Sequence, residues 1–113
     1  MRKILLAAMI GLWASNSFAH SSLETTIPQN GAIVSKAPSE ITLGFDNDIR
    51  LTRISMTYAD HQSVDLDLAG HDGFISNYTI PLQQVGAGHY IIEWRGLGSD
   101  GHTLNGSFDF TVE

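Results

Sequence analysis

Three residues of this sequence have the types and the spacing to hold a metal ion: His20, Asp100 and His102. Asp100 and His102 are two positions apart, so on an extended segment their side chains point to the same side. A carboxylate oxygen and an imidazole nitrogen would then face one ligand together. Ser-Asp-Gly is also a common turn sequence in which the aspartate bonds to its own backbone, so this pair alone leaves both interpretations open.

His20 becomes a stronger candidate if the chain before it is removed. Two basic residues precede an apolar stretch over residues 4–14, and small residues occupy positions −3 and −1 of a secretory cleavage site after Ala19. The apolar stretch is too short to cross a bilayer, which needs about 20 residues. We therefore predict a signal peptide over residues 1–19 and a single domain over residues 20–113. An uncleaved anchor is the alternative.

A histidine at the start of a chain offers both its α-amine and its imidazole to one metal ion. The amine titrates near pH 7.7–8.0 and the imidazole near about 6.5, so both donors are available close to neutrality. Two nitrogen donors in a tetragonal arrangement suit Cu(II), which also binds most strongly among the divalent first-row metals. With Asp100 and His102 completing the square, His20 would hold one Cu(II) ion. A frayed, solvated terminus is the other interpretation of His20.

Composition excludes several classes of function. The chain has 113 residues, with 6 Lys and Arg, 12 Asp and Glu, and no cysteine. Loss of the two basic residues at positions 2 and 3 would lower the net charge from −6 to −8. Such a charge argues against binding to nucleic acid or to anionic lipid, and we expect no insertion of the mature chain into a membrane. Without cysteine there is no disulfide, zinc-thiolate site, iron–sulfur cluster or thiol nucleophile.

The mature chain shows the two-residue alternation of β-strands. Apolar residues alternate with polar ones in six runs, over residues 40–45, 53–58, 63–68, 74–80, 89–95 and 106–113. Ile27, Ile33 and Val34 add one or two short strands, and turn-forming residues such as those at 46–48 separate the runs. We predict an all-β fold of about seven strands, an antiparallel Greek-key β-sandwich or barrel.

The alternation also predicts which residues face the core. The inward positions are Ile41, Leu43, Phe45, Ile54, Met56, Tyr58, Val64, Leu66, Leu68, Phe74, Ser76, Tyr78, Ile80, Tyr90, Ile92, Trp94, Phe108, Phe110 and Val112. His61 and His71 lie in polar turns, where we expect solvated side chains. His89 alternates with Tyr90 and is expected to face away from the core.

A series of motifs extends along the mature chain. After His20 come Ala-Pro-Ser-Glu-Ile-Thr-Leu-Gly-Phe at residues 37–45, Ala-Gly-His-Tyr at 87–90 leading to Trp94, Ser-Asp-Gly-His at 99–102, and Gly-x-Phe-x-Phe-x-Val at 106–112. In these motifs the chain resembles the CopC family of periplasmic copper-binding proteins.

The resemblance implies a fold, a site and a role. The fold is an Ig-like or cupredoxin-like Greek-key barrel. The site holds one Cu(II) ion through the N-terminal amine and imidazole of His20, together with Asp100 and His102. The role is periplasmic copper carriage or sequestration for homeostasis or resistance, without enzymatic activity. An inner-membrane copper-transport partner of the CopD type is implied as well.

The chain departs from the family pattern in three places. Many members carry a second histidine where this chain has Ser22. Some have a glutamate where it has Asn47, so that Asp46 or Asp48 could approach the site instead. Some hold Cu(I) in a methionine-rich loop, whereas Met56 is the only methionine of the mature chain and lies on an apolar strand face. We therefore predict one Cu(II) site and no Cu(I) site.

Two other functions stay open at this point. A histidine brace on copper also serves oxidative enzymes of the monooxygenase kind. The mature chain is short for such an enzyme, however, and Asp100 would fill a coordination position that O₂ chemistry needs. A metal-free β-sandwich interaction module is the second alternative, and it would show an exposed apolar strand edge or patch.

Overall fold

The structure is a computed structural model that describes residues 23–113, so the predicted signal peptide over residues 1–19 and His20 lie outside its described part. Seven strands occur in residues 23–113: β1 (Leu23–Ile27), β2 (Ala32–Val34), β3 (Glu40–Tyr58), β4 (Val64–Asp65), β5 (Ile75–Pro81), β6 (Gly88–Gly98) and β7 (Thr103–Val112). The prediction of an all-β fold with about seven strands is confirmed. In the same residues no helix is long and apolar enough to span a membrane.

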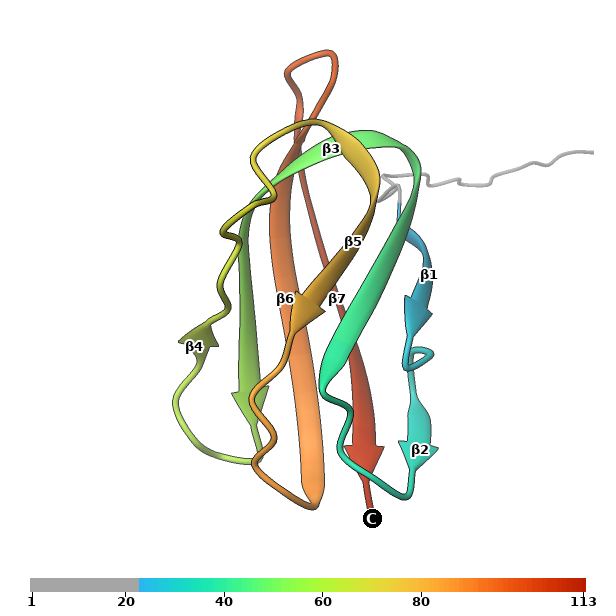
Figure 1. The fold of residues 1–113 in the computed structure, drawn as a ribbon, viewed down its shortest axis with the longest axis vertical. Coiled ribbons are helices and arrows are strands. Elements are labelled where there is room, and N and C mark those ends of the chain that lie inside the picture. The colour runs from blue at the N-terminus through green and yellow to red at the C-terminus, as the bar shows by residue number, and fades with distance from the viewer. Residues whose placement is uncertain (1–22) are drawn as a thin grey trace, which may run out of the picture.

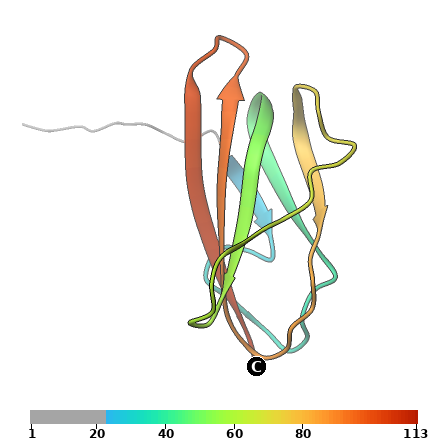
Figure 2. The same cartoon turned by 90° about the vertical axis from the view of Figure 1, so that its left-hand side faces the viewer.

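The seven strands form one sheet that curls until its two parts face each other. The strand order is β1-β3-β6-β7-β2, and β4 and β5 also pair with β3. The first half of β3 forms one layer with β1 and β5, and its second half forms the other layer with β6 and β7 (Figures 1 and 2). The pairings are antiparallel, as predicted, except that β2 runs parallel to β7.

β3 is long because it belongs to both layers. The turn predicted at residues 46–48 is instead a bend within one continuous strand. Across this bend the register between β3 and β5 shifts, between Gly44 and Ile49, and the other partner of β3 changes from β1 to β6. The three side chains of the bend are all exposed, which explains why their sequence is typical of a turn.

The side chain of Tyr78, a fully buried residue of β5, holds this bend from inside. Its hydroxyl oxygen lies 2.7 Å from the carbonyl oxygen of Ile49 and 3.1 Å from that of Gly73. The same oxygen accepts a hydrogen bond from the amide of Leu51 at 3.1 Å. One hydroxyl therefore serves three backbone groups where β3 changes partners, and such groups are costly to leave unpaired.

The predicted alternation accounts for most of the core. Thirteen predicted positions are buried: Ile41, Leu43, Phe45, Ile54, Met56, Tyr78, Ile80, Tyr90, Ile92, Trp94, Phe108, Phe110 and Val112. Tyr58, Leu66 and Leu68 are half-buried against this core. The predictions for Phe74 and Val64 are wrong, because these side chains are 45% and 46% exposed. Phe74 precedes the start of β5, and β4 is only two residues long.

The start of β1 and the turn between β6 and β7 lie at the same end of the sheet. Leu23 pairs with Phe45 just before the bend of β3, and Gly98 pairs with Ile49 just after it. The bend and the β6–β7 turn occupy one end of the molecule, and the C-terminus lies at the other (Figure 1). Asp100 and His102 are therefore at the end where the described chain begins.

Tyr78→Phe tests the role of the buried hydroxyl, since it keeps the ring and removes only the oxygen. We expect the free energy of unfolding to fall by about 1–3 kcal/mol, because buried backbone groups of the bend lose their partner. Denaturant titration measures this change. Tyr58→Phe is the matched control, because the Tyr58 hydroxyl lies at the surface and bonds only the carbonyl of Ala87. Equal losses in the two variants would contradict the assigned role.

Candidate metal centre

The turn between β6 and β7 presents residues 99–102 beyond the end of the sheet. The amide of Gly101 donates to the carbonyl oxygen of Gly98 at 2.9 Å, and the amide of Gly98 donates to that of His102 at 2.8 Å. Gly101 has a φ of +89°, in the left-handed region that favours glycine. Backbone hydrogen bonds thus close the turn, and its glycine separates Asp100 from His102.

The side chains of Asp100 and His102 lie together on this turn. Asp100 Oδ2 is 2.9 Å from His102 Nδ1, and Asp100 Oδ1 accepts a hydrogen bond from the amide of His102 at 3.1 Å. The His102 side chain is 82% exposed and that of Asp100 is 68% exposed. The pair is therefore ordered by its own contacts and remains open to solvent.

The contact between the two side chains shifts the pKa of each. The hydrogen bond from the His102 ring, strengthened by the bond from the His102 amide, lowers the pKa of Asp100. The same hydrogen bond, with the charge of the carboxylate, raises the pKa of His102 above its usual 6.5. Carboxylate and imidazolium therefore stabilise each other, although solvent screens the interaction at so exposed a site.

This geometry leaves one imidazole nitrogen available to a metal. When Nδ1 donates to the carboxylate, Nε2 keeps its lone pair, and the carboxylate orients the ring and makes it more basic. In a second arrangement an ion would replace the proton on Nδ1 and bind that nitrogen together with the carboxylate oxygen, since the two atoms are 2.9 Å apart. Within residues 23–113 no group of three or more His, Asp or Glu side chains is placed to hold an ion. Asp100 and His102 thus contribute two donors, and His20 lies outside the described residues.

The bend of β3 brings further polar side chains to this end. Asp46, Asn47 and Asp48 are all exposed, and the side-chain Nδ2 of Asn47 lies 3.4 Å from Asp46 Oδ1. In the described part of the chain these side chains form no hydrogen bond with Asp100 or His102. A contribution of Asp46 or Asp48 to the site stays a prediction.

The other exposed histidines lie away from this turn. His89 faces outward as expected, and its Nε2 is 2.9 Å from Asp109 Oδ2. It occupies the opposite end of β6 from Asp100 and His102. His61 is exposed, with its ring stacked on Tyr58 at a centroid distance of 5.3 Å. His61 and Met56 line one cavity of about 330 Å³, a proximity that the sequence pattern did not suggest.

The expectation of a solvated His71 is wrong. The His71 ring packs against Tyr78 with centroids 5.6 Å apart. Its Nδ1 is buried, and no hydrogen-bond partner for it occurs among residues 23–113. The Ala-Gly-His-Asp-Gly sequence predicted a polar turn, but the tertiary contact with a ring of β5 determines where the side chain lies.

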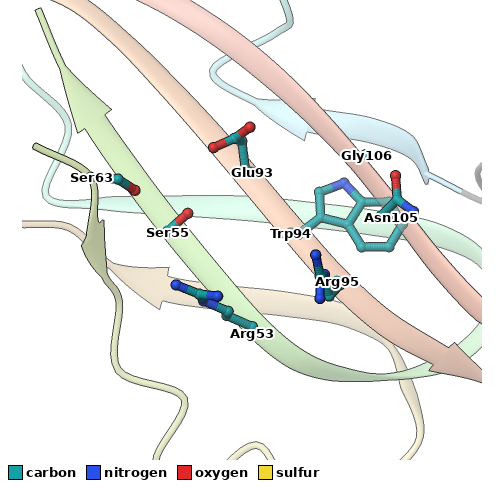
Figure 3. A pocket seen from close by; sticks show the side chains of 8 residues that line it. All are labelled: Arg53, Ser55, Ser63, Glu93, Trp94, Arg95, Asn105 and Gly106. Carbon is teal, nitrogen blue, oxygen red and sulfur yellow. The ribbon is translucent and has the colours of Figure 1, made fainter. Parts of the chain in front are cut away.

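Trp94 is buried in the core, as the alternation predicted. Its ring packs edge-on against Phe45 with centroids 5.0 Å apart. The indole lies across β7 at Gly106, where a Cβ atom would come within 2.9 Å of the ring (Figure 3). Glycine at position 106 therefore makes room for this indole.

A separate polar cavity of about 260 Å³ lies beside Trp94 (Figure 3). Arg53 and Arg95 are paired across β3 and β6 at this cavity. Arg53 also forms an ion pair with Asp65 at 3.0 Å, and Glu93 lines the same cavity. The cavity therefore contains charges of both signs and is distinct from the β6–β7 turn.

Known proteins resemble the chain along most of its length. The CopC domain family matches residues 23–113. Copper resistance protein C of Escherichia coli is 27% identical over 122 residues, covering 99% of this chain and 96% of that protein. Copper resistance protein C of Pseudomonas syringae pv. tomato is 27% identical over 104 residues, covering 84% and 82%.

Solved structures agree with the family match. The crystal structure of PcoC, a methionine-rich copper resistance protein from Escherichia coli, has a TM-score of 0.59 and 30% identity, covering 84% of this chain and 100% of that chain. CopC from Methylosinus trichosporium OB3b has a TM-score of 0.63 and 24% identity, covering 83% and 94%. At 24% identity, the likeness to the Methylosinus trichosporium protein is evidence for the fold alone.

The metal-free protein should show the coupling between Asp100 and His102. We expect the His102 ring to titrate above pH 6.5 and Asp100→Asn to lower that pKa, because the substitution removes the carboxylate charge. Ring-proton chemical shifts measured by NMR against pH test this, with an unstructured histidine peptide as the reference. An unchanged His102 pKa in Asp100→Asn would contradict the pairing.

The signs of the two shifts define where the pair stabilises the fold. The contribution of His102 is fully present below pH 6.5 and is lost as the pH rises through the raised pKa. The contribution of Asp100 is present above its ordinary pKa of 3.8 and is lost as the pH falls through the lowered one. The interaction between Asp100 and His102 therefore stabilises the fold between the lowered pKa of Asp100 and the raised pKa of His102.

Proposed function

Because the chain belongs to the CopC family, we propose that it binds one Cu(II) ion in the periplasm through His20, Asp100 and His102. The proposal includes a signal peptide over residues 1–19 and a single mature domain over residues 20–113. Family membership makes the protein a homologue of copper resistance protein C. It also places the protein among non-enzymatic copper carriers, in agreement with the prediction that it is not an enzyme.

The paired side chains of Asp100 and His102 on the β6–β7 turn are the observation that carries this proposal. Asp100 Oδ2 and His102 Nδ1 are 2.9 Å apart, so an ion that replaces the proton between them would take both atoms as neighbouring ligands. Both side chains are largely exposed, so an ion can reach them without opening the core. The carboxylate adds a negative charge that offsets part of the charge of a divalent cation.

His20 is near enough along the chain to complete the site. Leu23 begins β1 at the end of the sheet that carries the β6–β7 turn. The three residues back to His20 span about 10 Å when extended. β1 begins at this end of the sheet and runs away from it. This length supports an amine and an imidazole from His20 beside Asp100 and His102.

The donor set suits Cu(II) and not Cu(I). An amine, two imidazoles and a carboxylate provide three nitrogens and one oxygen, a combination that fits the tetragonal preference of Cu(II). Cu(I) prefers sulfur, and Met56, the only methionine of residues 23–113, is buried in the core. We therefore propose a single Cu(II) site per chain. Delivery to an inner-membrane partner of the CopD type belongs to the same proposal, because an exposed site permits transfer of the ion by direct contact.

Titration of the mature protein, beginning at His20, tests the site. We expect one equivalent of Cu(II) with an axial, nitrogen-rich electron paramagnetic resonance signal. His20→Ala and His102→Ala should each lower the affinity roughly a hundredfold or more, since each removes a nitrogen ligand. Asp100→Ala should lower it less, about tenfold, since it removes the one oxygen ligand and leaves the three nitrogen donors. Competition with a chelator of known affinity measures these changes.

A single alanine added before His20 is the sharpest control, because it displaces the amine and leaves every side chain in place. The affinity for Cu(II) should fall about as much as in His20→Ala. The fold, followed by circular dichroism, should be unchanged. His89→Ala is the matched histidine control and should bind Cu(II) normally, because His89 lies at the far end of β6. Equal affinity of the extended and the mature proteins would refute the proposed chelate.

Acid should release the ion, because protons compete for all three nitrogen donors. The amine and the imidazoles are largely protonated below about pH 5, so most of the Cu(II) should be free there. The raised pKa of His102 makes proton competition at that ring stronger than at an ordinary histidine. Loss of the copper signal on titration from pH 8 to pH 4 measures this. Full retention of Cu(II) at pH 4 would contradict nitrogen ligation.

A further inference from the structure

The backbone of β7 next to the β6–β7 turn has a free edge. β7 pairs with β6 without a register shift from Thr103 to Val112. In an antiparallel pair, alternate residues direct their N–H and C=O groups at the partner strand, and the residues between direct theirs away from it. Once the hydrogen bonds of one residue of β7 are known, the alternation shows which other residues point their N–H and C=O groups away from β6.

The hydrogen bonds of Asp109 show which backbone groups of β7 point away from β6. Its carbonyl oxygen accepts a hydrogen bond from the amide of Gly31 at 2.8 Å, and its amide donates to Asn30 Oδ1 at 3.0 Å. Both groups thus point away from β6. By alternation three further residues, here called the open edge, point the same way: Thr103, Asn105 and Ser107. Within residues 23–113 no partner for these backbone groups occurs on that side.

Ser107, the last residue of the open edge, lines a slot between β7 and β1. A cavity of about 520 Å³ is lined by residues 23–26 of β1 on one side and by Ser107 and Phe108 on the other. Gln29 and Asn30 close its lower end, and below them β2 pairs with the rest of β7. The unpaired stretch of β7 therefore begins at the candidate metal centre and ends where β2 takes over.

The open edge lacks the devices that usually protect a strand edge. Natural sheets blunt their edges with lysine, proline, bulges or an inward charge. Residues 103–107 are Thr-Leu-Asn-Gly-Ser, without charge or proline, and their pairing with β6 is regular. Among residues 23–113, three N–H and three C=O groups are thus left for an added strand.

We propose that the open edge binds an extended, positively charged segment of a partner protein, which adds to β7 as a further strand beside the metal centre. Main-chain hydrogen bonds to Thr103, Asn105 and Ser107 provide the affinity in this mode of recognition. The slot between β7 and β1 receives the segment, and the added strand extends the curled sheet on its open side.

Charge complementarity selects a basic segment. Glu24 lines the β1 side of the slot. Asp100, beside His102 on the turn, and Asp109, beside His89 and bonded through its amide to Asn30, add two carboxylates near its two ends. Asn105 also lines the polar cavity beside Trp94, where Arg53 and Arg95 are matched in number by Asp65 and Glu93. Residues 23–113 as a whole have four basic and twelve acidic side chains, so their net charge favours a basic segment over an acidic one.

A second copy of this chain fits the slot less well than a single strand does. Two copies carry the same strong negative charge and repel each other. The edge of a folded sheet also brings its neighbouring strands with it, and β1 stands across the slot where they would have to lie. A flexible segment carries no such bulk and enters the slot by its backbone alone.

The open edge lies beside the proposed copper site, so a role of this docking in copper transfer rests on the proposed function. Thr103 directly follows His102, so a partner strand on β7 would bring its own copper ligands next to the ion. The docking itself needs no copper, and it is tested in metal-free protein. Its failure would leave the Cu(II) titration unaffected, and failure of that titration would leave the docking unaffected.

A capped octapeptide in which lysine alternates with threonine is the probe, and the same peptide with glutamate in place of lysine is its control. The amide resonances of ¹⁵N-labelled mature protein are followed by NMR during titration. We expect saturable shifts and slowed hydrogen exchange at Thr103, Asn105 and Ser107 with the lysine peptide only. The exchange of Leu104, whose amide already faces β6, should change little.

Two substitutions at one position isolate the backbone contribution. Asn105→Pro removes the central outward N–H and no hydrogen bond to β6, and it should weaken peptide binding roughly tenfold. Asn105→Ala keeps that N–H and should bind as the unaltered protein does. If Asn105→Pro fails to fold, Glu24→Lys provides the second test, because it should weaken binding of the lysine peptide and strengthen binding of the glutamate peptide.

Three results would overturn the proposal. Shifts that spread over the molecule, or that the glutamate peptide reproduces, would show non-specific contact. Equal binding by Asn105→Pro and Asn105→Ala, with both folded, would show that the outward backbone groups are not used. Protection of Thr103, Asn105 and Ser107 that rises with protein concentration in the absence of peptide would make a second copy the occupant.

Discussion

The bend of β3 between Phe45 and Ile49 is the constraint on which the rest of the structure depends. β3 pairs with β1, β4, β5 and β6, so its path determines where four other strands lie. At the bend, one buried hydroxyl of Tyr78 compensates backbone groups that the change of strand partner leaves in the interior. The two layers, and the common end of β1 and β6, follow from that path.

The sequence pattern predicted the features that depend on neighbouring residues. Strict alternation placed Trp94, Phe108 and Phe110 in the core because each lies on a regular strand with one buried face. The features that it missed depend on contacts between distant segments. The residues at 46–48 are typical of a turn, yet a tyrosine some thirty positions later keeps them within one strand. His71 is likewise positioned by the ring of Tyr78 and not by its own polar neighbours.

The candidate metal centre also has a part that depends on neighbouring residues and a part that depends on contacts between distant segments. Asp100 and His102 lie two residues apart on a tight turn, so their contact is local and the sequence could predict it. The mutual distance of His20 and this pair depends on the whole topology of the sheet. The strand pairings bring the beginning of β1 to the end of the molecule that carries the turn, which no spacing in the sequence reveals. The parallel pairing of β2 with β7 was missed for the same reason.

The close approach of Trp94 to Gly106 has an optical consequence. Trp94 is the only tryptophan of residues 23–113, and it is buried a few residues before the β6–β7 turn. A buried indole of this kind emits at shorter wavelengths than a solvated one. The domain therefore contains an intrinsic fluorophore whose colour reports on the integrity of the core.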